Sequence, residues 1–300
     1  MKGEAVACRE LMLLLLLAFL WGSSYLLIRI ALTDFPPLTL IALRVLGAFC
    51  FLYVTMRWRS ERLPGDLLSW RRLMVQAFLN AIGAWTVLAW GQQFVDAGLA
   101  SVLNSTSPVF VLLFTALVTR HEPVSGMKVL GAALGLAGVS FVVGIDVFRG
   151  LGQEVAGQLA CLAGAMLYGG AALFGRRLVH SSALVVATGT MFCAVVVLVP
   201  AALIFEEPLK IVPGRDALLA VMALSLFCTG FALLLYFRLL RTLGALGVAS
   251  QSYLRAVIGV LLGIVVLGES MSLAVLLGVL ATLAGVVLIN SAGFSGLKRG

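Results

Sequence analysis

One arginine inside a long apolar stretch is the residue of this sequence that packing explains least. Arg255 lies well inside the apolar run 245–267, and no Asp or Glu lies well inside any comparable run. A charged side chain at the centre of a membrane helix costs about 2.5–3.5 kcal/mol on insertion scales. Two explanations stay open. The guanidinium either binds a carboxylate or phosphate of a substrate, or it satisfies helix carbonyls and snorkels toward water.

Amide side chains accompany this arginine. Gln251 precedes Arg255 by four residues and so shares its helical face, and Asn104 precedes Pro108 by the same spacing in the run 98–119. Pro108 removes one helical hydrogen bond and so frees a carbonyl for a neighbour or a ligand. The amides fit either a substrate cavity or hydrogen bonds between helices.

Aromatic side chains complete the candidate set. Trp21 and Tyr25 lie in the run 11–31, and Tyr168 lies in the run 156–174. Such rings can stack on a substrate or serve as core packing. We predict the following substrate-binding residues: Trp21, Tyr25, Asn80, Asn104, Pro108, Tyr168, Gln251 and Arg255. H-E-x-x-H, G-x-S-x-G and P-loop patterns are absent, so we expect no catalytic residue, metal or cofactor, and no enzyme.

The elements that position these residues are membrane helices. The chain has 300 residues, 62% hydrophobic and 11% charged, with a mean hydropathy of +1.11. This composition predicts an all-α polytopic membrane protein with ten transmembrane helices. The predicted spans are 11–31, 38–56, 73–94, 98–119, 127–145, 156–174, 182–205, 217–237, 245–267 and 272–292.

Basic residues are distributed unevenly between the loops on the two sides. Fifteen Lys and Arg residues lie on the side of the termini and three on the other side, which predicts that both termini are cytoplasmic. This distribution sets orientation and does not indicate a nucleic-acid partner. Arginine outnumbers lysine 17 to 4, which is typical of a GC-rich bacterial genome, so we expect a multi-pass protein of the bacterial inner membrane. The sequence gives no oligomeric state.

An internal repeat divides the chain into two halves, 1–150 and 151–300. Residues recur at an offset of 147, and Asn104 corresponds by the same offset to Gln251. The identical pairs include Glu122 and Glu269, Ser125 and Ser272, Gly131 and Gly278, and Gly138 and Gly285. Each half has five predicted spans, an odd number, so the second half must be inverted. Inverted repeats around a central cavity are typical of transporters.

Several motifs together resemble the EamA group of the drug/metabolite transporter superfamily. They are F-L-W-G-S-S-Y-L-L-I-R from Phe19, F-P-P-L-T-L-I-A-L-R from Phe35, L-A-S-V-L-N-S-T-S-P-V-F from Leu99 and V-L-G-E-S-M-S from Val266. The resemblance implies a ten-helix inverted-repeat carrier that exports metabolites such as amino acids through a central cavity. One position departs from the group, because Arg255 stands where a second proline is expected. A symmetrical kink of the two runs is therefore an open question.

These observations favour a secondary transporter of small metabolites that works by alternating access, with export expected by analogy. Its partners are then a small-molecule substrate and the lipid bilayer. The spans lack an acidic or histidine relay, which favours uniport or exchange over proton coupling. A non-transporting membrane receptor or scaffold is the alternative.

Overall fold

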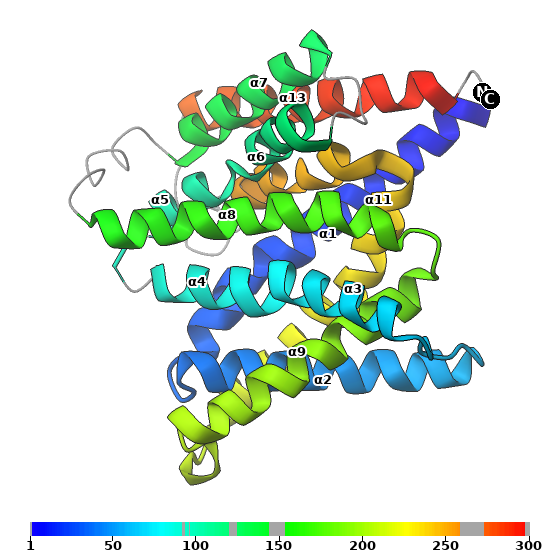
Figure 1. The fold of residues 1–300 in the computed structure, drawn as a ribbon. Coiled ribbons are helices and arrows are strands. Elements are labelled where there is room, and N and C mark those ends of the chain that lie inside the picture. Colours follow the sequence, from blue (N-terminus) through cyan, green and yellow to red (C-terminus); the bar gives the residue numbers. More distant parts are fainter. Residues whose placement is uncertain are drawn as a thin grey trace.

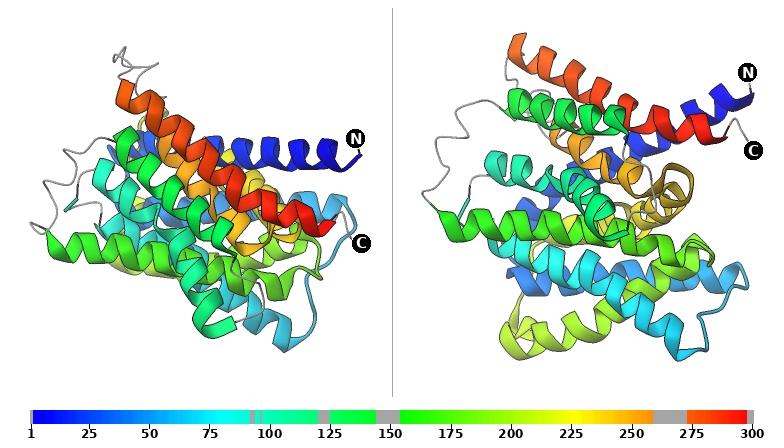
Figure 2. Two further views of the ribbon diagram at one scale, coloured as in Figure 1. Left: turned by 90° about the horizontal axis from the view of Figure 1, so that it is seen from above. Right: turned by 45° about the horizontal axis from the view of Figure 1, so that its top comes forward.

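Helices form all the regular secondary structure in the described part of the chain (Figure 1). The structure is a computed structural model that describes residues 2–91, 94–95, 97–119, 125–143, 154–258 and 273–297. Several long helices, among them α2, α4 and α8, run roughly side by side, whereas α1 crosses them obliquely (Figure 1). Helix α1 begins on the side of the bundle where α13 ends (Figures 1 and 2). This arrangement agrees with a polytopic all-α membrane fold.

The first half of the chain contains two uninterrupted long helices, followed by helices with breaks or widened turns. Its elements are α1 (Lys2–Ala31), α2 (Pro37–Trp58), α3 (Leu67–Ala77), the π-helical η1 (Phe78–Ile82), α4 (Gly83–Gly91), α5 (Ala97–Asn104), α6 (Ser107–Phe114), the π-helical η2 (Thr115–Thr119) and α7 (Gly126–Val143). Elements α3, η1 and α4 follow one another directly and form one continuous span.

The second half has a similar order of elements. It comprises α8 (Val155–Gly175), the 3-10 turn η4 (Arg176–Leu178), α9 (Ala183–Phe205), the 3-10 turn η5 (Pro208–Lys210), α10 (Arg215–Ser225), the π-helical η6 (Leu226–Phe231), α11 (Ala232–Ala249), a helix over 251–258 and α13 (Leu273–Leu297). Gly244 has φ 73° inside α11, a left-handed conformation that glycine adopts without strain. The chain turns there between the predicted spans 217–237 and 245–267.

Seven helices within the described residues are long and apolar enough to cross a membrane, and two shorter apolar helices cover 102–117 and 126–142. The prediction of several transmembrane helices is therefore confirmed. The predicted span 245–267 is described only to residue 258, so the count of ten remains a prediction. Glu122 and Glu269, which anchor the repeat in the sequence, lie outside the described residues.

Helices far apart in the sequence pack as pairs. Helix α2 packs on α9, α7 on α13, α4 on α8, and α1 on both α10 and α11. Each of these pairs joins one helix of the first half to one of the second. The two halves therefore share one continuous interior instead of forming two separate bundles.

The pair α2 and α9 is tied at both ends by carboxylates. Glu206, directly after α9, accepts hydrogen bonds from the backbone N–H groups of Leu38 and Thr39 at 3.0 and 2.5 Å. Glu61, shortly after α2, accepts a hydrogen bond from Ser182, the N-cap residue of α9. Each antiparallel helix is thus followed by a glutamate that satisfies or supports the other helix's N-terminus, where the dipole favours negative charge.

Glycines let α7 and α13 approach closely. A Cβ atom on Gly131 would lie 2.8 Å from the carbonyl oxygen of Gly285, and one on Gly138 would lie 2.7 Å from that of Gly278. The two contacts run in opposite directions along the helices, so the pair is antiparallel. Small residues at such crossings allow backbone packing in a membrane, where the hydrophobic effect adds little.

Candidate functional site

The π-helical turn η6 binds a buried arginine and one tryptophan, and a second tryptophan lies against the arginine. Trp21 donates its indole N–H to the carbonyl oxygen of Cys228 at 3.0 Å, and Arg44 reaches the same oxygen at 3.4 Å. Arg44 Nε also donates to Thr229 Oγ1 at 2.6 Å, and the guanidinium carbon lies 4.3 Å from the ring centre of Trp85. A π-helical turn breaks the usual hydrogen-bond ladder, which makes such a carbonyl available to side chains.

Trp21 is therefore fixed by the protein itself. Its ring is buried and lies 5.6 Å from the ring of Tyr236. Of the two roles the sequence allowed for Trp21, core packing has identified partners, whereas a substrate contact stays a prediction. The side chain of Tyr25 lies outside the described residues.

The fourth predicted span is broken at its centre. Helix α5 ends at Asn104, residues 105 and 106 form a turn, and α6 begins at Ser107 with Pro108 in its first turn. A proline is well tolerated there because its missing N–H would have no helical partner. The expected shared helical face of Asn104 and Pro108 is therefore wrong, since the break separates them.

The second half is broken at Ser250, next to the residue that corresponds to Asn104 at the offset of 147. No proline marks this break. Ser250 forms a turn between α11 and the helix over 251–258. Its hydroxyl donates to the carbonyl oxygen of Gly247 at 2.6 Å and accepts a hydrogen bond from Asn290 at 3.3 Å. Hydroxyl and amide groups therefore support this break, whereas Pro108 marks the one in the first half.

The two breaks meet inside the bundle. Ser105 Oγ donates to the carbonyl oxygen of Ser252 at 3.2 Å, and these residues are 147 positions apart. The neighbouring Asn104 and Gln251 are buried, and Asn104 Oδ1 and Gln251 Oε1 have no hydrogen-bond partner. An unsatisfied buried polar group costs about 1–3 kcal/mol. The two amide oxygens are thus acceptors that the protein leaves available.

Arg255 lies one helical turn beyond Gln251. Only 7% of its surface is exposed, and its guanidinium carbon lies 5.9 Å from the ring centre of Tyr168, within the range of a cation–π contact. A Cβ atom on Gly22 would lie 3.2 Å from the Arg255 carbonyl oxygen, so α1 passes directly beside this turn. The structure thus brings together two of the predicted site residues, Arg255 and Tyr168.

Two further amides are buried on the first half. Asn80 lies in η1, and its Nδ2 has no hydrogen-bond partner. Among the predicted site residues, it is the only one that the described part of the chain places in a π-helical turn. Gln76 lies one turn earlier, fully buried, with both amide atoms unpartnered, and sequence reasoning missed it. Gln76 lies near one end of the predicted span 73–94, so its place in the sequence did not indicate that it is buried. Among the described residues, no three His, Cys, Asp or Glu side chains are grouped to hold a metal ion.

Comparison with known proteins identifies the family twice within the chain. The EamA-like transporter family matches residues 9–144 and, separately, residues 155–291. The chain is 29% identical over 277 residues to the uncharacterized inner membrane transporter YedA of Escherichia coli K12, covering 91% of this chain and 88% of that protein. It is 24% identical over 280 residues to the uncharacterized transporter YoaV of Bacillus subtilis 168, covering 93% and 95%.

A solved crystal structure has a similar fold. It is 20% identical in sequence, with a TM-score of 0.79, and the match covers 95% of this chain and 98% of the other. These comparisons confirm the resemblance stated from the motifs around Phe19, Phe35, Leu99 and Val266. The chain belongs to the EamA-like transporter family.

Proposed function

We propose that this protein is a secondary transporter that exports small metabolites such as amino acids by alternating access between two inverted halves, 1–150 and 151–300. The central observation is the meeting of the two helix breaks, where the buried amide oxygens of Asn104 and Gln251 are unpaired and Gln251 lies one helical turn before Arg255. In this proposal Arg255 binds the substrate carboxylate. The amides of Asn104 and Gln251 orient the polar groups of the substrate, and Tyr168 contacts the apolar part of the substrate.

The pattern of contacts supports an inverted repeat. Adding 147 to Gly131 gives Gly278, and adding it to Gly138 gives Gly285, so the offset exchanges the contacts Gly131–Gly285 and Gly138–Gly278. A two-fold relation between the halves requires such an exchange. The match of the family to each half separately supports the same relation.

The contact between Ser105 and Ser252 supports the position of the site. These serines correspond to each other under the offset, and two equivalent residues can touch only close to the axis that relates them. Substrate sites of inverted-repeat transporters lie near this axis, at the middle of the membrane. Asn104, Gln251 and Arg255 flank that contact, which makes them the best candidates for the substrate site.

The proposed location is the bacterial inner membrane, with both termini in the cytoplasm. The printed name of the Escherichia coli relative describes an inner membrane transporter. The excess of Lys and Arg in the loops on the side of the termini supports the orientation. Helix α1 begins on the same side of the bundle on which α13 ends, which is consistent with both termini lying on one side of the membrane (Figure 2).

Flux measurements in proteoliposomes test the proposal. Purified wild type and Arg255→Gln are compared for export of labelled solutes that carry a carboxylate and of matched solutes that lack one. We expect the variant to lose carboxylate-bearing solutes selectively, by roughly tenfold to a hundredfold, because one charge-assisted hydrogen bond contributes about 1.5–3 kcal/mol.

Two controls separate binding from folding. Arg241→Gln removes one positive charge from an exposed position and is expected to transport like the wild type. Arg255→Lys keeps the charge without the planar fork and is expected to be intermediate. Equal loss of all solutes in Arg255→Gln, or equal flux in every variant, would assign Arg255 a structural role and contradict the proposed site.

A further inference from the structure

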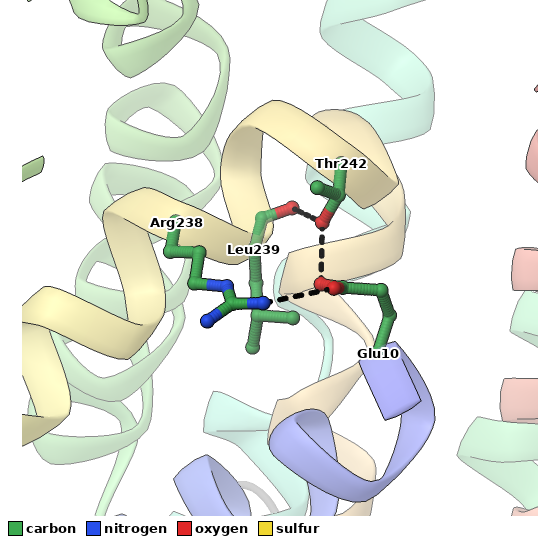
Figure 3. A network of polar contacts seen from close by, with 4 residues as sticks. All are labelled: Glu10, Arg238, Leu239 and Thr242. Atoms are coloured by element: carbon green, nitrogen blue, oxygen red, sulfur yellow. Dashed lines mark hydrogen bonds and ion pairs between the residues drawn. The ribbon is translucent and has the colours of Figure 1, made fainter. Parts of the chain in front are cut away.

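A buried carboxylate joins the two halves near the start of α1. Glu10 is only 4% exposed, and Arg238 Nη2 donates to its Oε1 at 3.2 Å while Thr242 Oγ1 donates to its Oε2 at 2.8 Å. Thr242 also contacts the carbonyl oxygen of Leu239 at 3.3 Å. Figure 3 shows the carboxylate reaching from α1 to two residues of α11. Both oxygens of Glu10 are thus bonded to the second half.

The cluster lies at one end of the predicted span 11–31. Glu10 directly precedes the predicted span 11–31, and the side chain of Arg238 is 39% exposed. Toward the bundle interior, the next residues on the same face of α1 are Leu14 and Leu17, both fully buried. The ion pair therefore closes the bundle surface above an apolar interior, on the side where the chain begins.

The internal repeat gives this crossing a counterpart with different chemistry. Adding 147 to Glu10 gives Gly157, and subtracting it from Arg238 gives Gly91. These two glycines also meet, because a Cβ atom on Gly91 would lie 2.9 Å from the carbonyl oxygen of Gly157. Equivalent crossings of the two halves are thus closed by a charged pair in one case and by backbone contact in the other.

We propose that Glu10, Arg238 and Thr242 form a latch that holds the transporter closed on the side of its termini, and that the Gly91–Gly157 crossing closes the other side. This inference rests on the alternating-access function proposed above. Access to one side requires helices of the two halves to separate there, and Glu10 is bonded across that boundary.

The different chemistry predicts different costs of opening. When the latch opens, Glu10 and Arg238 separate at the membrane surface, where water can solvate both charges. Opening then costs the two contacts of the buried Glu10 carboxylate, offset by the hydration that both charges regain. Opening the glycine crossing instead separates the packed backbones at Gly91 and Gly157, and no charged contact is broken. The latch is therefore the contact that polar substitutions can weaken selectively.

A buried reporter cysteine tests the latch without any substrate. The parent protein carries Cys8→Ala and Cys50→Ala, which remove the two exposed thiols, together with Leu17→Cys two turns below Glu10. A membrane-impermeant thiol reagent is added from the side of the termini, and the rate at which it labels the protein is measured. The labelling rate of a protein that carries Cys8→Ala and Cys50→Ala but keeps Leu17 is subtracted as background. We expect Glu10→Gln and Arg238→Gln to raise the labelling rate roughly five- to thirtyfold, the shift that one or two kcal/mol produces.

Matched variants decide the outcome. Arg241→Gln removes an exposed charge from the same helix and is expected to label like the parent, whereas the exchange Glu10→Arg with Arg238→Glu is expected to restore slow labelling. Melting temperatures and elution volumes identify any unfolded variant, and the exchange pair tests the latch even if a single variant unfolds. Unchanged labelling in folded Glu10→Gln and Arg238→Gln, or fast labelling in the exchange pair, overturns the latch.

Labelling is also independent of flux. A latch that opens in a protein with no measurable transport would contradict the proposed transport function and leave the latch in place. Transport with normal dependence on Arg255, together with unchanged labelling, would contradict the latch alone.

Discussion

At the scale of single residues, the hydrogen-bonding state separates structural from functional candidates. Arg44 and Trp21 are both buried polar side chains, and both use the carbonyl oxygen of Cys228. The amide oxygens of Asn104 and Gln251 are equally buried, yet they have no partner. Because an unsatisfied buried polar group is costly, amides of the second kind are the better candidates for contact with a solute.

Asp66 allows a prediction about pH. It is the N-cap residue of α3, exposed outside the predicted spans, and its carboxylate accepts a hydrogen bond from the backbone N–H of Ser69 at 2.7 Å. That bond lowers the pKa of Asp66 below its ordinary value of 3.8. A lowered pKa in the folded state gives stability that is present above the unfolded-state pKa and is lost as the pH falls through the folded-state pKa.

We therefore expect Asp66→Ala to lower the melting temperature at neutral pH, with the difference from the wild type shrinking as the pH falls below about 4. Asp66→Asn keeps a capping oxygen without the charge and is expected to lose less. Thermal unfolding in detergent over a pH series measures this. No loss in either variant at any pH would show that the cap does not stabilise α3.

At the scale of elements, irregular turns occur where the two halves are equivalent. The π-helical η1 and η6 begin at Phe78 and Leu226, and the offset of 147 carries the first to residue 225, so the two turns overlap. In η6 the widened turn offers the Cys228 carbonyl to α1 and α2 through Trp21 and Arg44. Neighbouring helices, and not the local sequence, supply the partners that stabilise this turn.

The glycine crossing of α7 and α13 allows a prediction at this scale. A Cβ atom on Gly138 would lie 2.6 Å from the backbone nitrogen of Thr282 and 2.7 Å from the carbonyl oxygen of Gly278. Backbone atoms can move away only if the helices separate. We expect Gly138→Ala to lower the free energy of unfolding by about 1–3 kcal/mol, the usual cost of overpacking.

Gly126 at the start of the same helix provides the control. A Cβ atom there would meet nothing within 4 Å. Gly126→Ala is expected to be neutral or stabilising by up to about 1 kcal/mol, because alanine has the higher helix propensity. Denaturant unfolding in mixed micelles compares the two variants, and equal effects would contradict a tight crossing.

At the scale of the whole molecule, the pairing of helices between halves determines how the protein can move. Helices α2, α7 and α1 each pack on helices of the second half, so a rocking motion must change contacts along the whole boundary. Carboxylates bridge this boundary at several places, including Glu206 and Glu61 at the ends of α2 and α9. Glu10 differs from these two because it binds a charged side chain as well as a hydroxyl.

Reporter fusions test the orientation that the charge distribution predicts. Green fluorescent protein attached at either end is expected to fluoresce, and alkaline phosphatase at either end to stay inactive, because both ends are placed in the cytoplasm. Alkaline phosphatase inserted after Glu207, in the loop between α9 and α10, is expected to be active. The opposite pattern would contradict the orientation, and different results at the two ends would contradict an even number of spans.

The sequence alone determined the class of the protein. Apolar runs interrupted by short charged loops predicted membrane helices, and the motifs around Phe19, Phe35, Leu99 and Val266 predicted the family, which the comparison confirmed. These properties are local, since each run must match the thickness of the bilayer by its own composition. The sequence also predicts that Arg255 lies deep in its span, and this depth stays a prediction. The substrate-binding residues as a set remain a prediction.

Only the tertiary structure decided which buried polar groups have partners. Glu10 lies 228 positions from Arg238, and Trp21 lies 207 positions from the carbonyl of Cys228, so no spacing in the sequence indicates either contact. The break at Ser250 has no proline to announce it, and Pro108 begins a helix where a shared face with Asn104 was expected. Hydrogen bonds of this kind depend on how helices are placed against one another, which local composition does not specify.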